Sequence, residues 1–452
     1  MKTGWYKKGI MLSSAAILAV SMSACGSNVK TSGVSEAPKE STSTTATEPA
    51  VKDVTLKFFS NTPDRTSGMG LLEQKLMDQY VSENPNIKIE LETASEPYGD
   101  KLKMYNASNK LPDVFVTWGD AAFMEPMINN NALAELDIND YKSQDFIPGS
   151  LEKFTKKGKL FGIPKNSDFW VVMYNKKIFA DNGLEIPTTL DELNNVSAKL
   201  KAKNIVPIAL AGKEQWEAGI TFDLFLQRAA GTFDVAKKGL DRTGSFNDPA
   251  VIEAAKNFQA MTKNGYFGTG FINNDYNTAK NMFAQGKAAM FLIGEWEMGL
   301  ATDTKIPEES RKEFGAFAFP GSEKAKSTDT AMWFGAGYSI SKNSKHLEES
   351  KAFLKWLFKP ENWAKNAWQT GTAIPTQKYD QFFTGKENEL QKDLTNIFSK
   401  ATTTSDIIQN ALLGEQQKEY YDALQKLLAA ASTPEQFQKS LEDAAIKNVE
   451  KK

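Results

Sequence analysis

The feature that most limits the fold is an alternation of short apolar strands with amphipathic helices along most of the chain. Val54–Phe59 alternates apolar and polar residues as a half-buried strand does, and apolar residues recur at helical spacing from Leu71. Ile87–Leu91 and Leu111–Val116 follow as further strands, with a helix predicted over residues 98–108 between them. This order predicts a parallel or mixed sheet covered by helices.

A second strand–helix series follows the first. Trp170–Tyr174 and Ala288–Leu292 have the composition of buried strands. Thr189 and Glu192 have the spacing of a capping box, in which each side chain bonds the other residue's backbone N–H, so a helix is predicted to begin there. Asp248 before a proline predicts another helix start. Two such series over this length predict an α/β chain with two lobes.

The N-terminal segment has the pattern of a secretory signal peptide. A lysine-rich start precedes an apolar stretch over residues 10–20, and small residues then lead to Cys25, the one cysteine of the chain. The apolar stretch is too short to span a bilayer, which needs about 20 residues. Residues 1–24 are therefore predicted to be removed, and the mature protein is predicted to be extracytoplasmic.

The segment Met22–Gly26 resembles a bacterial lipobox, with Met22 where leucine is usual. The resemblance implies that Cys25 carries lipid and anchors the protein to the outer face of the bacterial cell membrane. A secreted protein with a stray cysteine is the alternative. Residues 25–51 are rich in Ser, Thr and Ala with few large apolar residues, which is typical of a flexible tether.

Composition argues against several classes of function. The net charge of −2 gives no general attraction to nucleic acid. With one histidine, His346, and no cysteine after Cys25, the chain is poorly equipped for general-base, triad or zinc chemistry. We expect no cofactor, no metal and no enzyme, although catalysis by carboxylates alone stays open. Residues 137–140 faintly suggest a calcium loop, but their spacing is not that of an EF-hand and a polar turn is the better interpretation.

Several segments, in order over much of the chain, resemble those of extracellular solute-binding proteins of carbohydrate ABC transporters, the group that includes maltose-binding protein. Each segment is weakly specific alone, and their shared order carries the resemblance. The segments are Leu111–Phe115, Gly158–Pro164, Met173–Phe179, Ile186–Leu193, Ile205–Ile208, Phe283–Met290 with Gly294 and Trp296, Gly337–Lys342 and Ala373–Pro375.

The resemblance implies a two-lobe fold like that of periplasmic binding proteins, each lobe a mixed β-sheet flanked by helices, with the ligand in a cleft between them. Mapping the segments in order assigns residues 52–166 and 315–360 to lobe one, and residues 171–312 and 363–452 to lobe two. A monomer is expected that captures a sugar or oligosaccharide by lobe closure and delivers it to a membrane permease.

Sugar recognition requires aromatic faces for the C–H surface of each ring and polar groups for its hydroxyls. Trp296 follows an apolar strand where the resembling family stacks a sugar ring. Trp216 follows a strand and a glycine turn, and Trp333 precedes glycines that would let a ligand approach the backbone. Each could instead be a core residue. Trp170 and Trp356 are predicted to be core residues, and Trp363 and Trp368 fit either role.

Polar ligand contacts are carried over from the same resemblance. Trp118 and Asp120 correspond to an aromatic residue and an aspartate that meet the sugar, although they could cap the lobe core and the next helix. Residues Asn61, Asp64 and Arg65 occupy a turn where polar contacts are expected, and a solvated turn is the alternative. Asp168 corresponds to a sugar-binding carboxylate near the hinge, and helix capping is its alternative.

Two other functions remain open. The same fold could bind a cationic solute such as a polyamine through Asp120, Asp168 and Glu295. A lipoprotein glycosidase could use Asp120 and Asp168 as its carboxylate pair, although sequence shows neither the required separation nor a raised pKa. The scarcity of arginine favours a neutral saccharide as the ligand.

Overall fold

A computed structural model describes residues 52–94, 98–402 and 407–450. The predicted signal peptide, Cys25 and the tether lie outside these residues. The strands and helices of the first lobe are β1 (Val54–Ser60), α1 (Gly68–Glu83), β2 (Ile87–Thr93), α2 (Tyr98–Ala107), β3 (Val114–Trp118), α3 (Met124–Asn129), η1 (Ile138–Tyr141), η2 (Glu152–Phe154), β4 (Thr155–Lys156), β5 (Lys159–Leu160), β6 (Ile163–Pro164), β12 (Ala336–Ile340) and α11 (Leu347–Leu357), where η marks a 3₁₀ helix.

The second lobe contains the remaining elements, except for α12 (Trp363–Gln369), which packs on both cores. These elements are β7 (Asp168–Asn175), α4 (Lys176–Asp181), α5 (Leu190–Ala202), β8 (Val206–Ala209), α6 (Trp216–Ala230), α7 (Asp234–Asp241), α8 (Pro249–Lys263), η3 (Phe271–Asn273), α9 (Tyr276–Ala284), β9 (Ala288–Gly294), η4 (Glu295–Ala301), α10 (Glu308–Arg311), β10 (Phe314–Ala318), β11 (Met332–Trp333), η5 (Asp380–Phe382), α13 (Glu389–Lys400), α14 (Ile408–Ala411), α15 (Gly414–Leu428) and α16 (Pro434–Glu450).

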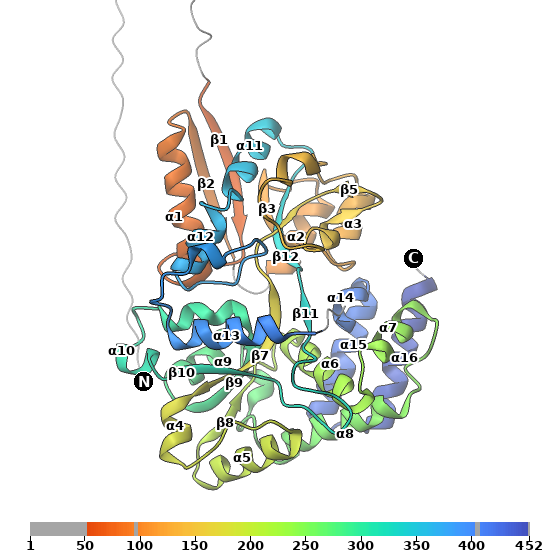
Figure 1. Ribbon diagram of the computed structural model, residues 1–452. Coiled ribbons are helices and arrows are strands. Elements are labelled where there is room, and N and C mark those ends of the chain that lie inside the picture. The colour runs from red at the N-terminus through yellow and green to blue at the C-terminus, as the bar shows by residue number, and fades with distance from the viewer. Residues whose placement is uncertain (1–51, 95–97, 403–406, 451–452) are drawn as a thin grey trace, which may run out of the picture. The chain divides into compact units, whose positions relative to one another are not determined.

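The first lobe is built on a mixed sheet with strand order β2-β1-β3-β12-β6 (Figure 1). The strands β1, β2 and β3 are parallel, as the strand–helix alternation predicts, and β12 enters antiparallel between β3 and β6. Leu56 and Phe58 of β1 pack with Leu72 and Leu76 of α1 in one hydrophobic core. Side chains two residues apart on the strand and four residues apart on the helix therefore face the same buried core.

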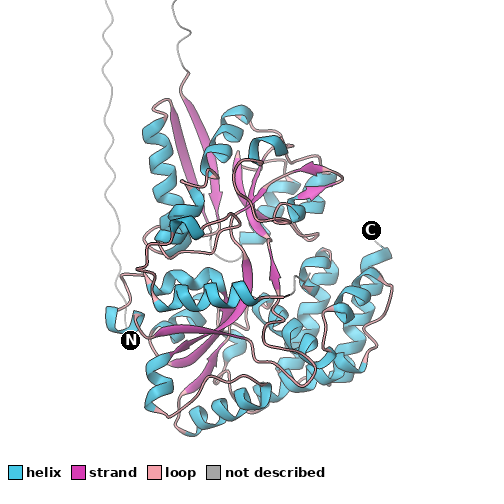
Figure 2. Ribbon diagram, viewed as in Figure 1, coloured by secondary structure: helices cyan, strands magenta, loops and turns pink. Residues whose placement is uncertain are grey.

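The second lobe has a sheet of order β10-β7-β9-β8, with β11 also paired to β7. Every residue of β7 and of β9 is buried, which explains why these strands are continuous apolar runs and not alternating ones. Figure 2 shows helices flanking the strands of each sheet.

The division of the chain between lobes differs from the predicted one. β10 and β11 pair with β7, so residues 314–318 and 332–333 belong to the second sheet, whereas the predicted lobe one includes residues 315–360. Trp363, predicted to begin a lobe-two segment, is fully buried in the first core. Backbone pairing partners decide these assignments, and the order of segments along the chain does not reveal them.

Local signals placed the helix starts correctly. Thr189 and Glu192 form the predicted capping box at α5, since the Thr189 hydroxyl accepts from the Glu192 N–H and the Glu192 side chain accepts from the Thr189 N–H. Asp248 caps α8, where its side chain accepts from Ala250 N at 2.8 Å. Both predictions are confirmed because a cap needs only residues two or three positions apart.

The chain passes between the lobes at three places, which we call the crossing segments: residues 165–168, 334–336 and 373–376. Backbone bonds connect them, since Lys165 N donates to Ala336 O at 2.9 Å and Ser167 N donates to Ile374 O at 2.8 Å. Trp363 Nε1 also donates to Lys165 O at 2.6 Å. Within the described residues, every helix is too short or too polar to cross a bilayer.

Candidate functional site

Five aromatic side chains of the second lobe meet near the crossing segments. This aromatic cluster joins Trp170 of β7, Trp216 at the start of α6, Tyr276 at the start of α9, Trp296 of η4 and Trp333 of β11. Ring centroids of neighbouring members lie 5.6 Å (Trp170–Trp296), 6.1 Å (Trp170–Trp216), 6.0 Å (Trp216–Trp296), 5.7 Å (Trp216–Tyr276) and 6.3 Å (Trp296–Trp333) apart.

The members of the aromatic cluster differ in burial. Trp170 is fully buried, as predicted for a core residue, and Trp333 is 7% exposed. Trp216, Trp296 and Tyr276 are half-buried residues at the edge of the core. The three thus form a partly exposed aromatic surface backed by two buried indoles, which suits a ligand with apolar faces.

Glycines let these rings lie directly on the backbone. A side chain at Gly294 would stand 2.0 Å from the Trp296 ring, and one at Gly335 would stand 2.6 Å from the Trp333 ring. Gly335 thus makes room for the neighbouring Trp333 ring. The approach of a ligand to the backbone there stays a prediction. Gln215, immediately before Trp216, has φ of +70°, a strained conformation of the kind that often accompanies binding sites.

The turn after β1 carries a charged network. The Glu73 carboxylate of α1 accepts from Arg65 at 2.7 Å, Ser60 at 2.6 Å and Tyr338 at 2.7 Å. Lys165 Nζ lies 4.0 Å from the same carboxylate. Burial would raise the pKa of Glu73, but these two cations and the hydrogen bonds outweigh it and lower that pKa.

The predicted polar residues of this turn lie in different surroundings. Asp64 accepts from Lys305 of the second lobe at 2.7 Å and from Thr66 and Ser67. By contrast, Arg65 Nε and Nη2 and Asn61 Oδ1 are buried and have no hydrogen-bond partner among the described residues. Buried polar atoms without partners are uncommon, and a bound ligand is one explanation for them.

Trp118 and Asp120 lie beside the second crossing segment. Trp118 pairs with Ala336, and Gly119 N donates to Gly335 O at 2.7 Å. The half-buried Trp118 ring packs on Phe123, and Asp120 Oδ1 accepts from Phe123 N at 3.2 Å. This bond closes the turn before α3, whose N-cap residue is Phe123, so Asp120 does not itself cap the helix. Burial raises the pKa of Asp120 to about 7.

Asp168 connects crossing segments instead of capping a helix. It is the first residue of β7, and its Oδ2 accepts from the backbone N–H groups of Gly335 at 3.3 Å and Ala336 at 3.2 Å. The helix-capping alternative is therefore wrong. The Asn166 side chain donates both to Asp168 and to Glu295 Oε1, the latter at 2.8 Å. Two carboxyl groups thus share one amide at the junction of the lobes.

Both of these carboxyl groups are shifted towards their protonated forms. Burial, the largest effect, raises the pKa of Asp168 to about 7 against hydrogen bonds and Lys165, which lower it. Burial and the charge of Asp168 raise the pKa of Glu295 well above its ordinary value. A like-charged pair in a low-dielectric site resists double ionisation.

This raised pKa predicts that stability depends on pH. An unfolded aspartate titrates near pH 3.9, so between about pH 4 and the folded pKa of about 7 the folded protein binds more protons than the unfolded chain. The contribution of Asp168 to stability is therefore complete below about pH 4 and is lost as the pH rises to about 7. We expect Asp168→Asn to flatten the pH dependence of the free energy of unfolding by up to about 1.4 kcal/mol per pH unit.

Urea unfolding at several pH values between 5 and 8 measures this slope. The exposed Asp191→Asn on α5 is the matched control and should keep the wild-type slope. An unchanged slope in Asp168→Asn would contradict the prediction.

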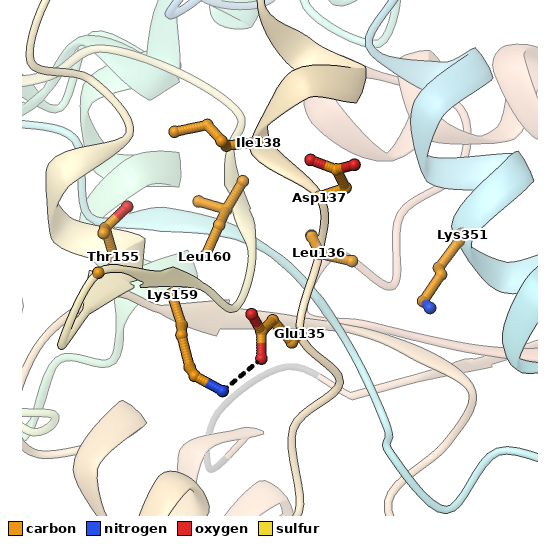
Figure 3. A pocket seen from close by; sticks show the side chains of 9 residues that line it. Glu135, Leu136, Asp137, Ile138, Thr155, Lys159, Leu160 and Lys351 are labelled. Atoms are coloured by element: carbon orange, nitrogen blue, oxygen red, sulfur yellow. Dashed lines mark hydrogen bonds and ion pairs between the residues drawn. The ribbon is translucent and has the colours of Figure 1, made fainter.

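Two pockets that open to solvent lie away from these residues. One of about 390 Å³ is lined by Glu135, Asp137, Lys159 and Lys351 among others, and in Figure 3 Lys159 reaches Glu135 at 2.7 Å. The other, of about 420 Å³, adjoins Trp368 and Glu387. Among the described residues, none of those predicted for the site lines either cavity.

The possible calcium loop is a polar turn. Asp137 Oδ1 accepts from Asn139 N at 2.9 Å, and Asp140 pairs with Lys355 at 2.5 Å. In the described ranges, His, Cys, Asp and Glu side chains do not gather in threes that could hold a metal ion.

Sequence reasoning missed Tyr276, Glu73 and Lys165. Tyr276 directly follows the helix cap Asp275, and its sequence position does not distinguish it from the many tyrosines that lie at a protein surface. Glu73 and Lys165 are charged residues of the kind usually exposed, and both are almost fully buried here. One signal was available for Glu73, since it stands at helical spacing among buried apolar residues of α1.

Comparison with known proteins agrees with this architecture. The family model for bacterial extracellular solute-binding proteins matches residues 62–362. The multiple sugar-binding protein of Streptococcus mutans is 26% identical over 372 residues, covering 78% of this chain and 79% of that protein. A solved structure from a study of xylan utilization by Caldanaerobius polysaccharolyticus has a TM-score of 0.80 and 27% identity, over 86% of this chain and 99% of the other.

A chitin oligosaccharide binding protein has the same fold, with a TM-score of 0.77 at 23% identity over 88% of this chain and 99% of that one. The predicted two-lobe α/β fold is confirmed by these structures together with the two sheets described above.

Proposed function

Because the chain belongs to the family of bacterial extracellular solute-binding proteins, we propose that it captures a saccharide between its two lobes and delivers it to the permease of an ABC importer. The family consists of extracytoplasmic binding proteins. The observation that carries the choice of ligand is the partly exposed surface formed by Trp216, Trp296 and Tyr276. Relatives support it, since one is named for multiple sugars and another was solved in work on xylan utilization.

The chemistry of a sugar ring fits this surface. The C–H face of a pyranose is apolar and can cover an indole, while its hydroxyl rim needs polar partners. Trp216 and Trp296 lie 6.0 Å apart with 46° between their planes, too close and too tilted to enclose a ring between them. We therefore infer that they form a continuous platform on which the saccharide lies.

Polar atoms of the other lobe that are buried without partners among the described residues in this arrangement would bind the hydroxyls. The Nε and Nη2 atoms of Arg65 form the edge of the guanidinium that lacks partners, because Nη1 already binds Glu73. That edge presents two parallel donors, which suit two neighbouring hydroxyl oxygens. Asn61 Oδ1, also without a partner among the described residues, can accept from another hydroxyl.

The lobes meet next to both groups of residues. Asp64 adjoins Arg65 and pairs with Lys305, and a side chain at Gly299 would stand 2.9 Å from the Gly68 α-carbon. Gly68 begins α1, and Gly299 follows Trp296 on η4. This contact would bring the platform of one lobe and the polar turn of the other onto one ligand when the lobes close.

Further parts of the proposal rest on sequence. Cys25 would carry the lipid that anchors the protein to the outer face of the bacterial membrane, residues 25–51 would serve as the tether, and the protein would work as a monomer. We propose a neutral saccharide and no catalysis. Residues 52–166 and 336–360 would form lobe one, and residues 168–333 with 374–450 would form lobe two.

The structure weakens the alternatives. A cationic solute would need accessible carboxylates, yet Asp168 and Glu295 are 3% and 0% exposed, and burial favours their neutral forms. A glycosidase would need two carboxyl groups facing one bond. Asp120 closes a turn before α3, and both Asp168 oxygens accept hydrogen bonds from the protein.

A ligand panel tests the proposal. The melting temperature of the protein from residue 52 onwards is measured with each of a set of candidate ligands. The set contains xylo-, malto-, galacto- and chitin oligosaccharides and spermidine. We expect at least one neutral saccharide to raise the melting temperature, since a ligand that binds only the folded state stabilises it, by about 2.7 kcal/mol at a hundredfold excess over Kd. Stabilisation by spermidine alone would favour the cationic alternative, and hydrolysis products in the same samples would indicate a glycosidase.

A further inference from the structure

Tyr276 contacts both partly exposed indoles, those of Trp216 and Trp296. Trp296 Nε1 donates to the Tyr276 hydroxyl at 3.1 Å. The Tyr276 ring lies 5.7 Å from the Trp216 ring with 35° between their planes. The indole nitrogen is the single polar atom of its side chain, so this bond restricts rotation of the Trp296 ring.

Hydrogen bonds connect the backbone near Tyr276 to the loop that precedes Trp216. Tyr276 N donates to Glu214 Oε2 at 3.1 Å, and Lys213 N donates to Asn274 O at 3.1 Å. Tyr276 therefore contacts the Trp216 side through its backbone and ring, and the Trp296 side through its hydroxyl. The strained Gln215 lies in the same loop, which shows that the loop is held in a conformation it would not adopt alone.

Glu297 determines the direction of the hydroxyl proton. The Tyr276 hydroxyl donates to Glu297 Oε1, and Lys280 Nζ lies 3.7 Å from that oxygen. A phenol has one proton, so a tyrosine that donates to a carboxylate presents its lone pair elsewhere, in this case to Trp296 Nε1. Burial and Glu297 raise the pKa of Tyr276 well above its ordinary value, so the proton is retained.

Lys280 completes the arrangement. It stands one helical turn after Tyr276 on α9, with Nζ 5.4 Å from the centre of the Tyr276 ring. Its charge balances Glu297 and occupies the ring face that a cationic ligand would otherwise use. The aromatic cluster thus leaves the faces of Trp216 and Trp296 for a neutral ring.

We infer that Tyr276 is a positioning residue that fixes the indoles of Trp216 and Trp296 in one relative orientation and thereby sets the affinity for the saccharide. Glu297 orients the Tyr276 hydroxyl. The inference rests on the proposed function, because it concerns the same binding surface. Pre-organised side chains bind more tightly since they lose less freedom when the ligand arrives.

The test compares Tyr276→Phe with the wild type in two measurements. The first is the indole N–H resonance of Trp296 in the ligand-free protein, assigned from its absence in Trp296→Phe. The second is Kd for the tightest-binding oligosaccharide of the panel. Tyr276→Phe keeps the ring against Trp216 and removes only the hydroxyl, so we expect a shifted, faster-exchanging Trp296 resonance and binding weakened roughly three- to tenfold.

Two further variants separate positioning from general destabilisation. Tyr266→Phe removes a hydroxyl from the same core and should leave both measurements unchanged. Glu297→Gln should weaken binding less than Tyr276→Phe, and the double variant should bind no more weakly than Tyr276→Phe because Glu297 acts through that hydroxyl.

The outcomes distinguish this inference from the proposed function. If the wild type binds an oligosaccharide and Tyr276→Phe binds it within twofold, or if the Trp296 resonance does not move, the positioning role is wrong. If the wild type binds no oligosaccharide of the panel, the proposed function itself fails, and the resonance still shows whether the hydroxyl holds Trp296.

Discussion

Trp296→Ala is expected to weaken saccharide binding by about 2–4 kcal/mol, roughly 30- to 1,000-fold in Kd, while the protein stays folded. The ring is half-buried and belongs to the proposed platform, so its removal takes away a face on which the sugar would lie. Its removal also leaves the Tyr276 hydroxyl without a donor. Isothermal titration with the best oligosaccharide of the panel measures the change in affinity.

The control variant, Trp356→Ala, is expected to lower stability and leave affinity unchanged. Trp356 of α11 belongs to the first core and donates to Glu83 at 2.7 Å, away from the aromatic cluster. Trp356→Ala should lower the melting temperature and leave the Kd of the remaining folded protein near the wild-type value. Equal affinities for Trp296→Ala and the wild type would remove Trp296 from the site.

The second large effect is expected from Gly299→Ala, a change of one methyl group. The new Cβ would stand 2.9 Å from the Gly68 α-carbon, well inside the optimum of about 3.5–4.0 Å for two carbon atoms. Overpacking of this kind costs about 1–3 kcal/mol. Because the contact joins the lobes, we expect the cost to fall on the closed arrangement and to weaken ligand binding roughly five- to 150-fold.

Gly414→Ala is the matched control. Gly414 begins α15, and a side chain there would meet open space. Both substitutions replace a helical glycine with alanine, so both gain helix propensity, and only Gly299→Ala strains the contact between the lobes. Small-angle X-ray scattering of the ligand-free variants should show a larger radius of gyration for Gly299→Ala alone. Wild-type affinity and radius in Gly299→Ala would contradict the idea that this contact limits closure.

The fold could be predicted from sequence to a large extent. The alternation of strands and helices predicted mixed sheets, and the ordered segments from Leu111 to Pro375 predicted the family, both of which are confirmed. The boundary between the lobes was harder to predict from sequence. The strand β10 pairs with β7 across about 140 residues of chain, and the sequence of a five-residue strand does not specify so distant a partner.

The residues of the candidate site could be named from sequence more readily than the contacts that each of them makes. Trp216, Trp296 and Trp333 were each proposed separately, and the structure brings them together with Trp170. Whether they bind a ligand stays a prediction, as does the lipid on Cys25. Asp64 and Asp168, expected to meet the sugar, bond Lys305 and the backbone of residues 335–336. Their contact with a ligand also stays a prediction.

Sequence by itself determined the elements whose stabilising contacts are local. The capping box of Thr189 and Glu192 and the N-cap at Asp248 need partners only two or three residues away, so their patterns are sufficient. The tertiary structure alone decided the contacts between distant segments: Gly68 with Gly299, Asp64 with Lys305, and Asn166 with Glu295. These pairs form because two sheets and three crossing segments bring them together, and burial there changes what a carboxyl group or a tyrosine can do.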